Sequence, residues 1–318
     1  MKIVVLDGNR LNPGDNPWDG VAAFGELEVY DWSEARQVAE RAAAADIILT
    51  NKSLVSAESI ARLPQLKYIS VLATGYNIVD VQAARARNIP VSNVPEYGTD
   101  SVAQYVFALL LELCHHVGHH AQAVASGEWE SSGTWSLFQT SLVELVAKTV
   151  AVVGFGRIGR RVGELAHAFG MEVLAVDLRE DNPPAYEPFA FVSMEEAFRR
   201  ADVVSLNCAL TAENEGLVDR RVLATMKPNA FLINAARGPL VREADLAEAL
   251  NSGQIAGAGV DVVSTEPIRA DNPLLEAKNC IITPHIAWAS LEARRRLMKT
   301  TEENIASFLS GEPQNVVN

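Results

Sequence analysis

The chain has 318 residues, of which 48% are hydrophobic, and a formal net charge of −13. This length predicts about two domains, and the acidic charge excludes a nucleic-acid partner, which needs a basic face. The apolar run within residues 1–7 is too short for a signal peptide or a membrane span, and charged residues flank it closely. We therefore expect no membrane partner and a cytoplasmic location.

The first part of the chain alternates short apolar runs with helical patterns. Strands are expected at residues 2–6, 27–30, 46–50, 66–73 and 89–94. A helix is expected at residues 34–45, and Ser56 is a good N-cap for another that ends near residue 63. The alternation predicts a parallel sheet, which here lacks a glycine fingerprint.

Two turns follow strands of this sheet, at the edge where parallel sheets bind ligands. They read Thr50-Asn51-Lys52-Ser53 and Ala73-Thr74-Gly75-Tyr76-Asn77. Exposed amides beside the glycine of the second turn can form a nest for a carboxylate. We therefore expect a small ligand to contact Asn51, Lys52, Thr74 and Gly75.

A long apolar helix is expected from Thr99 and would lie where the chain passes between two lobes. It leads into a histidine-rich segment, residues 115–120, that contains i, i+4 pairs. A histidine cluster at the end of a helix is more often ordinary surface than a ligand set, so we predict no metal site. Residues 127–141 have no clear period and read as an extended arm, with Trp129 and Trp135 as candidates for subunit contacts.

Residues 150–177 have the pattern of a βαβ unit: a β-branched run, a glycine turn, an amphipathic helix and a second apolar run. Gly154 suits the tight turn, Gly156 allows the backbone to approach a pyrophosphate, and Gly159 allows close packing of helix on strand. The free N–H groups at the start of the helix bind phosphate. The pattern predicts a dinucleotide site, and the alternative is a similar lobe with an empty site.

Asp177 stands eighteen residues after the last glycine, at the end of the second strand. A carboxylate there accepts hydrogen bonds from a ribose diol and repels a 2′-phosphate, so we expect NAD rather than NADP. Arg179 qualifies this expectation because it can meet a 2′-phosphate.

The second lobe continues the same alternation. Further strands are expected at residues 202–207, 230–234, 255–262 and 280–283, and helices at residues 194–200, 243–250 and 288–309. The last helix is expected to return to the first lobe. Cys114, Cys208 and Cys280 are widely spaced in apolar runs, which predicts free thiols.

Arg237, Glu266 and His285 follow three successive strands of the second lobe, so all three are expected at one sheet edge. Arginine holds a carboxylate and polarises a carbonyl. Histidine titrates near neutrality and can protonate an oxygen that becomes an alcohol. A glutamate bonded to the other ring nitrogen would fix the histidine tautomer. The set is complete for reducing a 2-oxo acid.

Five motifs together resemble the D-isomer-specific 2-hydroxyacid dehydrogenases along the whole chain. They are Gly-Phe-Gly-Arg-Ile-Gly at 154–159, Asn-Ala-Ala-Arg-Gly at 234–238, Gly-Val-Asp-Val at 259–262, Thr-Glu-Pro at 265–267 and Thr-Pro-His-Ile-Ala at 283–287. Three further segments, residues 50–52, 73–77 and 285–290, are most similar to the glycerate dehydrogenase (hydroxypyruvate reductase) branch.

The resemblance implies an α/β fold of two Rossmann-like, doubly wound parallel-sheet lobes with a cleft that closes on the cofactor. It implies a flavodoxin-like substrate domain at residues 1–98 plus 288–318, an NAD-binding Rossmann domain at residues 99–287, and a homodimer built through the cofactor domain. It implies that His285 is the acid/base and that the amides of Thr74 and Gly75 bind the substrate carboxylate. Other expected cofactor contacts are Arg157, Ile158, Cys208, Ala235 and Asp261, the last to the nicotinamide carboxamide.

The expected activity is NAD(H)-linked interconversion of D-glycerate and hydroxypyruvate, with glyoxylate as a second substrate. A D-lactate-type or other D-2-hydroxyacid dehydrogenase remains an alternative, as does an NAD-sensing binding protein without catalysis. Two departures from the family pattern bear on this: Ala209 stands where many members have proline, and Tyr76 stands where many have a smaller or acidic residue. Tyr76 would narrow the substrate pocket, so it affects the branch more than the reaction.

Overall fold

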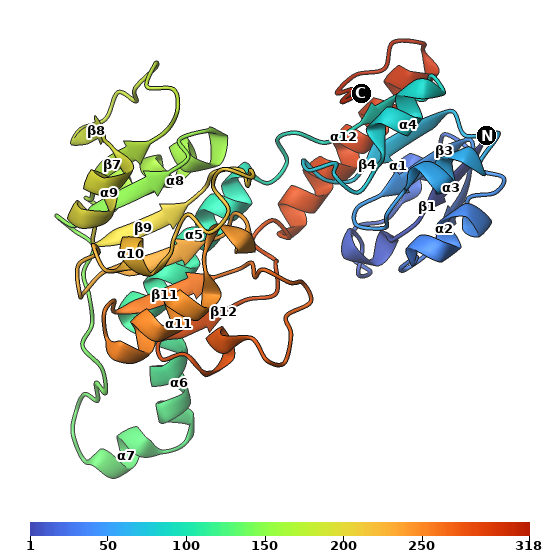
Figure 1. Cartoon of the computed structure of the whole chain (residues 1–318). Helices are drawn as coiled ribbons and strands as arrows, with labels where there is room; N and C mark the ends of the chain where they lie inside the picture. The colour runs from blue at the N-terminus through green and yellow to red at the C-terminus, as the bar shows by residue number, and fades with distance from the viewer. The chain divides into compact units, whose positions relative to one another are not determined.

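The computed structural model describes residues 1–318, without the side chain of Arg10, and the chain divides into two compact units (Figure 1). Unit 1 comprises Met1–Gly98 and Ala289–Asn318, and unit 2 comprises Thr99–Trp288. Each unit contains one parallel sheet flanked by helices. The predicted α/β class is therefore confirmed.

The sheet of unit 1 has five parallel strands in the order β2-β1-β3-β4-β5. The strands are β1 (Lys2–Val5), β2 (Glu26–Val29), β3 (Ile47–Thr50), β4 (Tyr68–Val71) and β5 (Val91–Ser92). The inner strands β3 and β4 are buried along their whole length, as their continuous apolar runs require, whereas the edge strand β2 is partly exposed. This order is the flavodoxin-like one, with its switch point between β1 and β3.

Short helices connect these strands. They are α1 (Asp19–Ala22), α2 (Ala35–Arg41), α3 (Ala57–Ala61) and α4 (Val81–Ala86), with a 3₁₀ turn η1 at Gly8–Arg10. The predicted N-cap is confirmed, because the side chain of Ser56 accepts a hydrogen bond from the Ser59 N–H. The prediction that α2 runs to residue 45 is wrong, because the chain turns after Arg41 toward β3 and tertiary structure overrides the helix propensity of the alanines.

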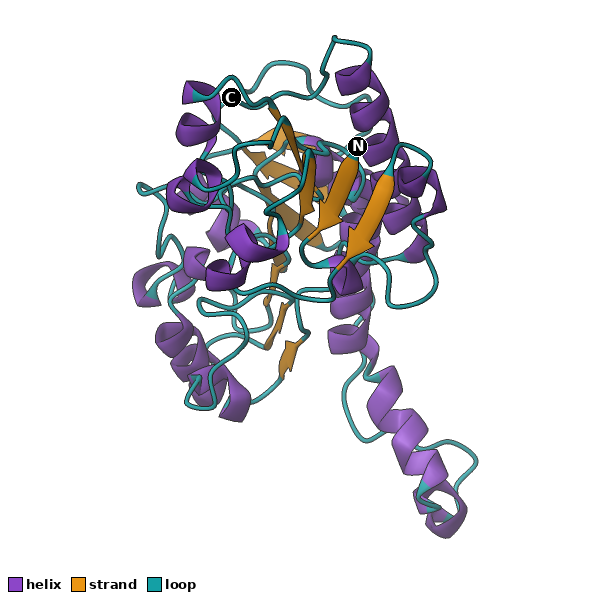
Figure 2. Cartoon of the chain, turned by 90° about the vertical axis from the view of Figure 1, so that its right-hand side faces the viewer, coloured by secondary structure: helices purple, strands orange, loops and turns teal.

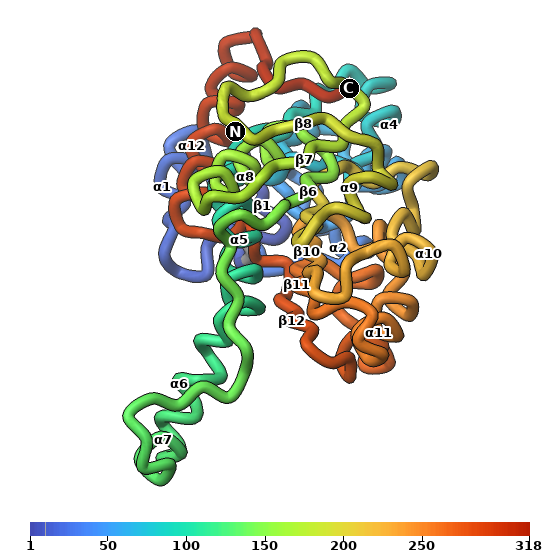
Figure 3. The backbone as a smooth tube through the Cα atoms, turned by 90° about the vertical axis from the view of Figure 1, so that its left-hand side faces the viewer, coloured from blue at the N-terminus to red at the C-terminus, as the bar shows by residue number. Residues whose placement is uncertain are grey.

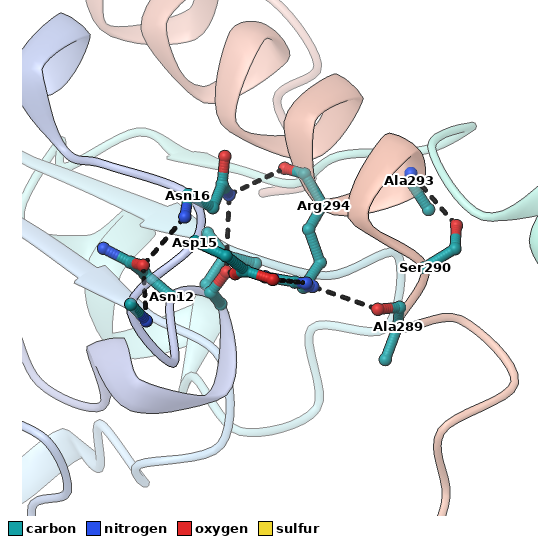
Figure 4. Close-up of polar contacts among 9 residues, drawn as sticks. Asn12, Asp15, Asn16, Ala289, Ser290, Ala293 and Arg294 are labelled. Atoms are coloured by element: carbon teal, nitrogen blue, oxygen red, sulfur yellow. Dashed lines mark hydrogen bonds and ion pairs between the residues drawn. The ribbon is translucent and has the colours of Figure 1, made fainter.

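The C-terminal helix α12 (Leu291–Leu309) belongs to unit 1. The ring of Tyr68 on β4 stacks on Phe308, with centroids 4.5 Å apart. Arg294 is buried near the start of α12, and its guanidinium forms a two-pronged ion pair with Asp15 in the loop after β1 (Figure 4). The side chain of Asn16 donates to the carbonyl of Arg294. These contacts fix the helix to the N-terminal part of the unit.

Unit 2 contains a seven-stranded parallel sheet in the order β12-β11-β10-β9-β6-β7-β8. The strands are β6 (Thr149–Val153), β7 (Glu172–Val176), β8 (Phe189–Phe191), β9 (Val203–Leu206), β10 (Phe231–Asn234), β11 (Gly257–Val260) and β12 (Cys280–Ile282). Counted from β6, the strand order is that of a doubly wound dinucleotide-binding sheet with one further strand.

Helices cover both faces of this sheet. They are α5 (Thr99–His115), α8 (Arg157–Ala168), α9 (Met194–Arg200), α10 (Arg220–Leu223) and α11 (Glu243–Ser252), with 3₁₀ turns η2 (Gly238–Leu240) and η3 (Pro273–Glu276). Along β6, Val150 and Val152 pack with α5 and α8, whereas Ala151 and Val153 pack with α9, α10 and α11. The sheet therefore separates two buried cores, as a doubly wound unit requires.

Helices α6 (Val117–Ala125) and α7 (Glu128–Ser132) project from the body of unit 2 as an arm (Figures 2 and 3). The chain breaks at His116, whose φ of 48° is left-handed, so the predicted histidine pairs do not share one helix. The interpretation of residues 127–141 as an extended arm is wrong at residues 128–132, which form α7. The described residues include no group of three or more histidine, cysteine or acidic side chains able to hold a metal ion.

Candidate active site

The glycine turn joins β6 to α8, and each of its glycines has a distinct steric environment. Gly154 has a φ of 90°, and a Cβ there would lie 2.5 Å from the backbone nitrogen of Cys208. A Cβ on Gly159 would lie 2.0 Å from the carbonyl oxygen of Gly154, whereas one on Gly156 meets nothing within 4 Å. The turn is thus closely packed at Gly154 and Gly159 but open at Gly156, at the N-terminus of α8. This shape fits a pyrophosphate.

Asp177 lies directly after β7 and is linked to the same turn. Its Oδ2 accepts a hydrogen bond from the Phe155 N–H at 2.6 Å, and its Oδ1 accepts one from the Arg179 N–H at 3.0 Å. A carboxylate has about four acceptor positions, so it can still bind hydroxyl groups. The carboxylate therefore stands beside the open turn.

The other predicted cofactor residues lie at the same sheet edge. Arg157 and Ile158 open α8, with Arg157 exposed and Ile158 half-buried. Cys208 follows β9 and Ala235 follows β10, so both come after strand ends. Burial raises the pKa of the Cys208 thiol.

Arg237 lies in a turn whose backbone is hydrogen-bonded by the side chain of Asn234. Asn234 ends β10 and is 1% exposed. Its Oδ1 accepts the Ala236 N–H at 3.0 Å, and its Nδ2 donates to the carbonyl of Arg237 at 2.9 Å. The Arg237 side chain remains exposed, and its guanidinium donates to the carbonyl of Ala236. Asn234 was not predicted to have a role, although a polar residue at the end of an apolar strand is a signal for one.

Gly238 brings the arginine turn against the loop that carries Glu266. A Cβ on Gly238 would lie 2.0 Å from the carbonyl carbon of Val263 and 2.5 Å from the nitrogen of Ser264, so only glycine allows this approach. The carboxylate of Glu243 accepts the Ser264 N–H at 2.7 Å and the Ser264 hydroxyl at 2.6 Å. Both contacts fix the position of the glutamate loop.

Glu266 and His285 form a direct pair. The Nδ1 atom of His285 lies 2.7 Å from Oε2 of Glu266, and the two side chains are 37% exposed for Glu266 and 26% exposed for His285. This contact fixes the ring orientation and leaves Nε2 as the nitrogen not engaged by Glu266. Arg237, Glu266 and His285 thus follow β10, β11 and β12, which are neighbours in the sheet.

His285 has a φ of 56°, a left-handed conformation that costs free energy unless its surroundings hold it. Asp261 supplies that support. Its main-chain oxygen accepts the His285 N–H at 2.8 Å. Its carboxylate accepts the Thr283 hydroxyl at 2.7 Å and the N–H groups of Ile286 and Ala287 at 3.0 and 2.8 Å.

Asp261 itself is 1% exposed, and burial raises the pKa of its carboxyl while these hydrogen bonds oppose the rise. The structure therefore gives Asp261 a place in shaping the histidine loop. Its contact to a nicotinamide carboxamide stays a prediction.

The remaining candidates belong to unit 1, in the turns after the neighbouring strands β3 and β4. Thr74 is exposed and its hydroxyl donates to the carbonyl of Val94 at 3.0 Å. Among the residues that the structure describes, the N–H groups of Thr74 and Gly75 form no hydrogen bond, so they can receive a carboxylate. Lys52 is exposed, whereas Asn51 is 3% exposed and donates to the carbonyl of Leu72.

Residues 107–287 match the family model described as D-isomer specific 2-hydroxyacid dehydrogenase, NAD binding domain. The chain is 50% identical to a hydroxypyruvate reductase of Blautia hydrogenotrophica over 321 residues, covering 100% of both chains. It is 35% identical to a glycerate dehydrogenase of Methylorubrum extorquens, covering 99% of this chain and 98% of the relative. The solved structure of the TT0316 protein from Thermus thermophilus has a TM-score of 0.88 at 34% identity, with full coverage of both chains.

Proposed function

Since this chain belongs to the D-isomer-specific 2-hydroxyacid dehydrogenases and is an NAD-dependent oxidoreductase of D-2-hydroxy acids, we propose that it interconverts D-glycerate and hydroxypyruvate. Glyoxylate is the expected second 2-oxo acid. The observation that carries the proposal is the Glu266–His285 pair beside Arg237, at the ends of three adjacent strands. The name of the full-length Blautia relative supports the choice of substrate.

The three side chains divide the work of reduction. Arg237 offers a planar fork of donors that polarises the 2-oxo group and holds the adjacent carboxylate. His285 donates a proton from Nε2 to the oxygen that becomes the alcohol, and in oxidation the same atom accepts it. Glu266 accepts the Nδ1–H, which fixes the ring orientation and stabilises the imidazolium that gives up its Nε2 proton in reduction. The neutral ring that remains is protonated on Nδ1, so its Nε2 is the acceptor in oxidation. When bound, NADH would supply the hydride for the 2-oxo carbon.

Unit 1 is inferred to be the substrate domain. The N–H groups of Thr74 and Gly75 suit the substrate carboxylate, and Lys52 adds a positive charge in the neighbouring turn. A net charge of −13 would otherwise repel an anionic substrate, so a local cation has a clear role. Unit 2 would hold the cofactor through the open glycine turn and Asp177.

NADH oxidation against hydroxypyruvate, glyoxylate, pyruvate and a bulkier 2-oxo acid tests the proposed substrate. We expect the highest kcat/KM with hydroxypyruvate, followed by glyoxylate. Activity confined to pyruvate or to the bulkier acid would retain the reaction and reject the glycerate branch.

Replacing Asp177 with alanine should raise the ratio of kcat/KM for NADPH to that for NADH by about tenfold, because it removes the charge that repels a 2′-phosphate. Steady-state kinetics with each cofactor measures the ratio. Asp181→Ala is the matched control, since it removes an exposed acid from the same loop. An unchanged ratio in Asp177→Ala would mean that the ribose is recognised by other residues.

The arm formed by α6, α7 and residues 133–146 is proposed to build a homodimer through the cofactor domain. Trp135 is 89% exposed and Phe138 is 74% exposed, within a segment whose other exposed apolar side chains include Val124 and Trp129. So much apolar surface is typical of an interface. The double variant Trp135→Ser, Phe138→Ser should sediment as a monomer, whereas Trp32→Ser, which removes an exposed tryptophan from unit 1, should not change the sedimentation coefficient.

A cytoplasmic location is also proposed, because all three cysteines are free thiols and suit a reducing compartment. Among the helices described, none has the length and apolar character of a membrane-spanning segment. Cell fractionation with an antibody to the chain tests the location.

A further inference from the structure

A buried carboxylate lies beneath the turn that presents Lys52. Asp7 follows β1 and is 0% exposed. Its Oδ1 accepts the N–H of Asn51 at 2.8 Å, and its Oδ2 accepts the N–H groups of Lys52 and Ser53 at 2.5 and 2.7 Å. Three consecutive amides of one turn thus converge on a single side chain. The turn is fixed from beneath at the switch point between β1 and β3.

Neighbouring hydroxyls complete this arrangement. The Thr50 hydroxyl donates to the carbonyl of Ser53 at 2.9 Å and lies 3.5 Å from Oδ2 of Asp7. The Ser53 hydroxyl donates to the carbonyl of Ser33 at 2.8 Å. A buried carboxylate is tolerated only where such donors satisfy it, so Asp7 and the turn hold each other in one conformation.

The arrangement decides which groups of the turn remain available to a ligand. A row of converging amides would otherwise be an anion-binding nest, but here Asp7 already occupies it. The backbone of residues 51–53 therefore cannot also receive a substrate carboxylate. What the turn presents is the exposed side chain of Lys52.

Asn51 extends the same support to the next turn. Its backbone N–H is held by Asp7, and its side chain donates to the carbonyl of Leu72 at 2.5 Å. Leu72 lies two residues before Thr74, whose N–H and that of Gly75 were assigned to the substrate carboxylate. The contact chain from Asp7 through Asn51 thus reaches the segment that carries those amides.

We propose that Asp7 is a positioning residue for substrate binding, which acts by fixing the Asn51–Lys52–Ser53 turn and, through Asn51, the Thr74–Gly75 turn. Asp7 does not touch the substrate. The proposal rests on the substrate role given to these turns above. It predicts that loosening the turn weakens the binding of 2-oxo acids and leaves cofactor binding unchanged, because the cofactor residues belong to unit 2.

Asp7→Asn is the direct test, since asparagine keeps the size but places an NH₂ group against an amide N–H. We expect KM for hydroxypyruvate to rise about tenfold, while kcat and the Kd for NADH from fluorescence titration stay within about twofold. Asp46→Asn is the matched control. Asp46 also binds a backbone amide in unit 1, that of Lys2 at 2.9 Å, and precedes β3 rather than following it. It should lower Tm without changing KM.

Two further variants keep the outcome decisive. Thr50→Val loosens the same turn more gently, so it should raise KM in the same direction even where Asp7→Asn does not fold. Lys52→Ala tests the substrate role of the turn itself. A raised KM in Lys52→Ala alone, with Asp7→Asn and Thr50→Val unchanged, would reject the positioning role but keep the proposed function. An unchanged KM in all three variants would reject the substrate role of the turn. An equal rise of KM in Asp46→Asn would reject the positioning role of Asp7, because the rise would then come from a general loss of stability.

Discussion

His285→Ala should lower kcat for reduction of hydroxypyruvate by about 10²–10⁴-fold, the usual contribution of a positioned general acid. The variant loses the proton donor, but the glycine turn and Asp177 stay intact, so the Kd for NADH should remain within about twofold. Stopped-flow or steady-state NADH oxidation gives kcat, and fluorescence titration gives the Kd. A fall in kcat without a fall in cofactor affinity places the histidine in the chemical step.

His167→Ala is the matched control, because His167 is an exposed histidine of the same unit that stacks on Tyr186. Its kcat should be unchanged. Glu266→Gln retains a side chain of the same length but loses the charge on the partner of Nδ1, so its kcat should fall less than that of His285→Ala. Retained turnover in His285→Ala would remove this residue from the mechanism.

Arg237→Ala should lower kcat/KM for every 2-oxo acid on the order of 10²–10⁴-fold. Two charge-assisted hydrogen bonds of about 1.5–3 kcal/mol each are lost, and each 1.4 kcal/mol corresponds to about tenfold. Arg237→Lys should recover only a small part of this loss, because an ammonium group cannot reproduce the planar fork of a guanidinium. The measurement is the kcat/KM series over the four acids used above.

Arg269→Ala controls for the loss of an exposed arginine in the same unit, since Arg269 forms an ion pair with the nearby Asp271. It should leave kcat/KM unchanged. If Arg237→Ala affected one acid and spared the others, the arginine would contact the variable part of the substrate rather than the shared 2-oxo acid group.

Much of the fold follows from local pattern. The continuous apolar runs of β3, β4 and β6 could be recognised because buried parallel strands need them, and the glycine turn because each glycine has its own steric requirement. Element ends were less predictable. Helix α2 stops at Arg41 although alanines follow, and α4 was missed because its six residues are too few to show a helical period.

The site residues whose side-chain chemistry suggests a catalytic role could be predicted from the sequence. Those whose role depends on their neighbours in space were harder to predict. Arginine, glutamate and histidine after successive strands indicate a catalytic site. Asn234, Gly238 and Asp7 do not, because their roles depend on which backbone groups lie opposite them in space. Two glycines show the difference. Gly156 faces open space, whereas Gly238 faces the main chain of Val263, and the residue type alone does not distinguish these environments.

Unit 1 cannot be completed until the ribosome has added helix α12, since this unit takes in Ala289–Asn318. Residues 99–288, by contrast, are contiguous and can fold as they emerge. Until α12 has been synthesised, Tyr68 on β4 lacks its stacking partner Phe308, and Asp15 lacks its ion-pair partner Arg294. The unit that begins the chain is thus the last to be completed during synthesis.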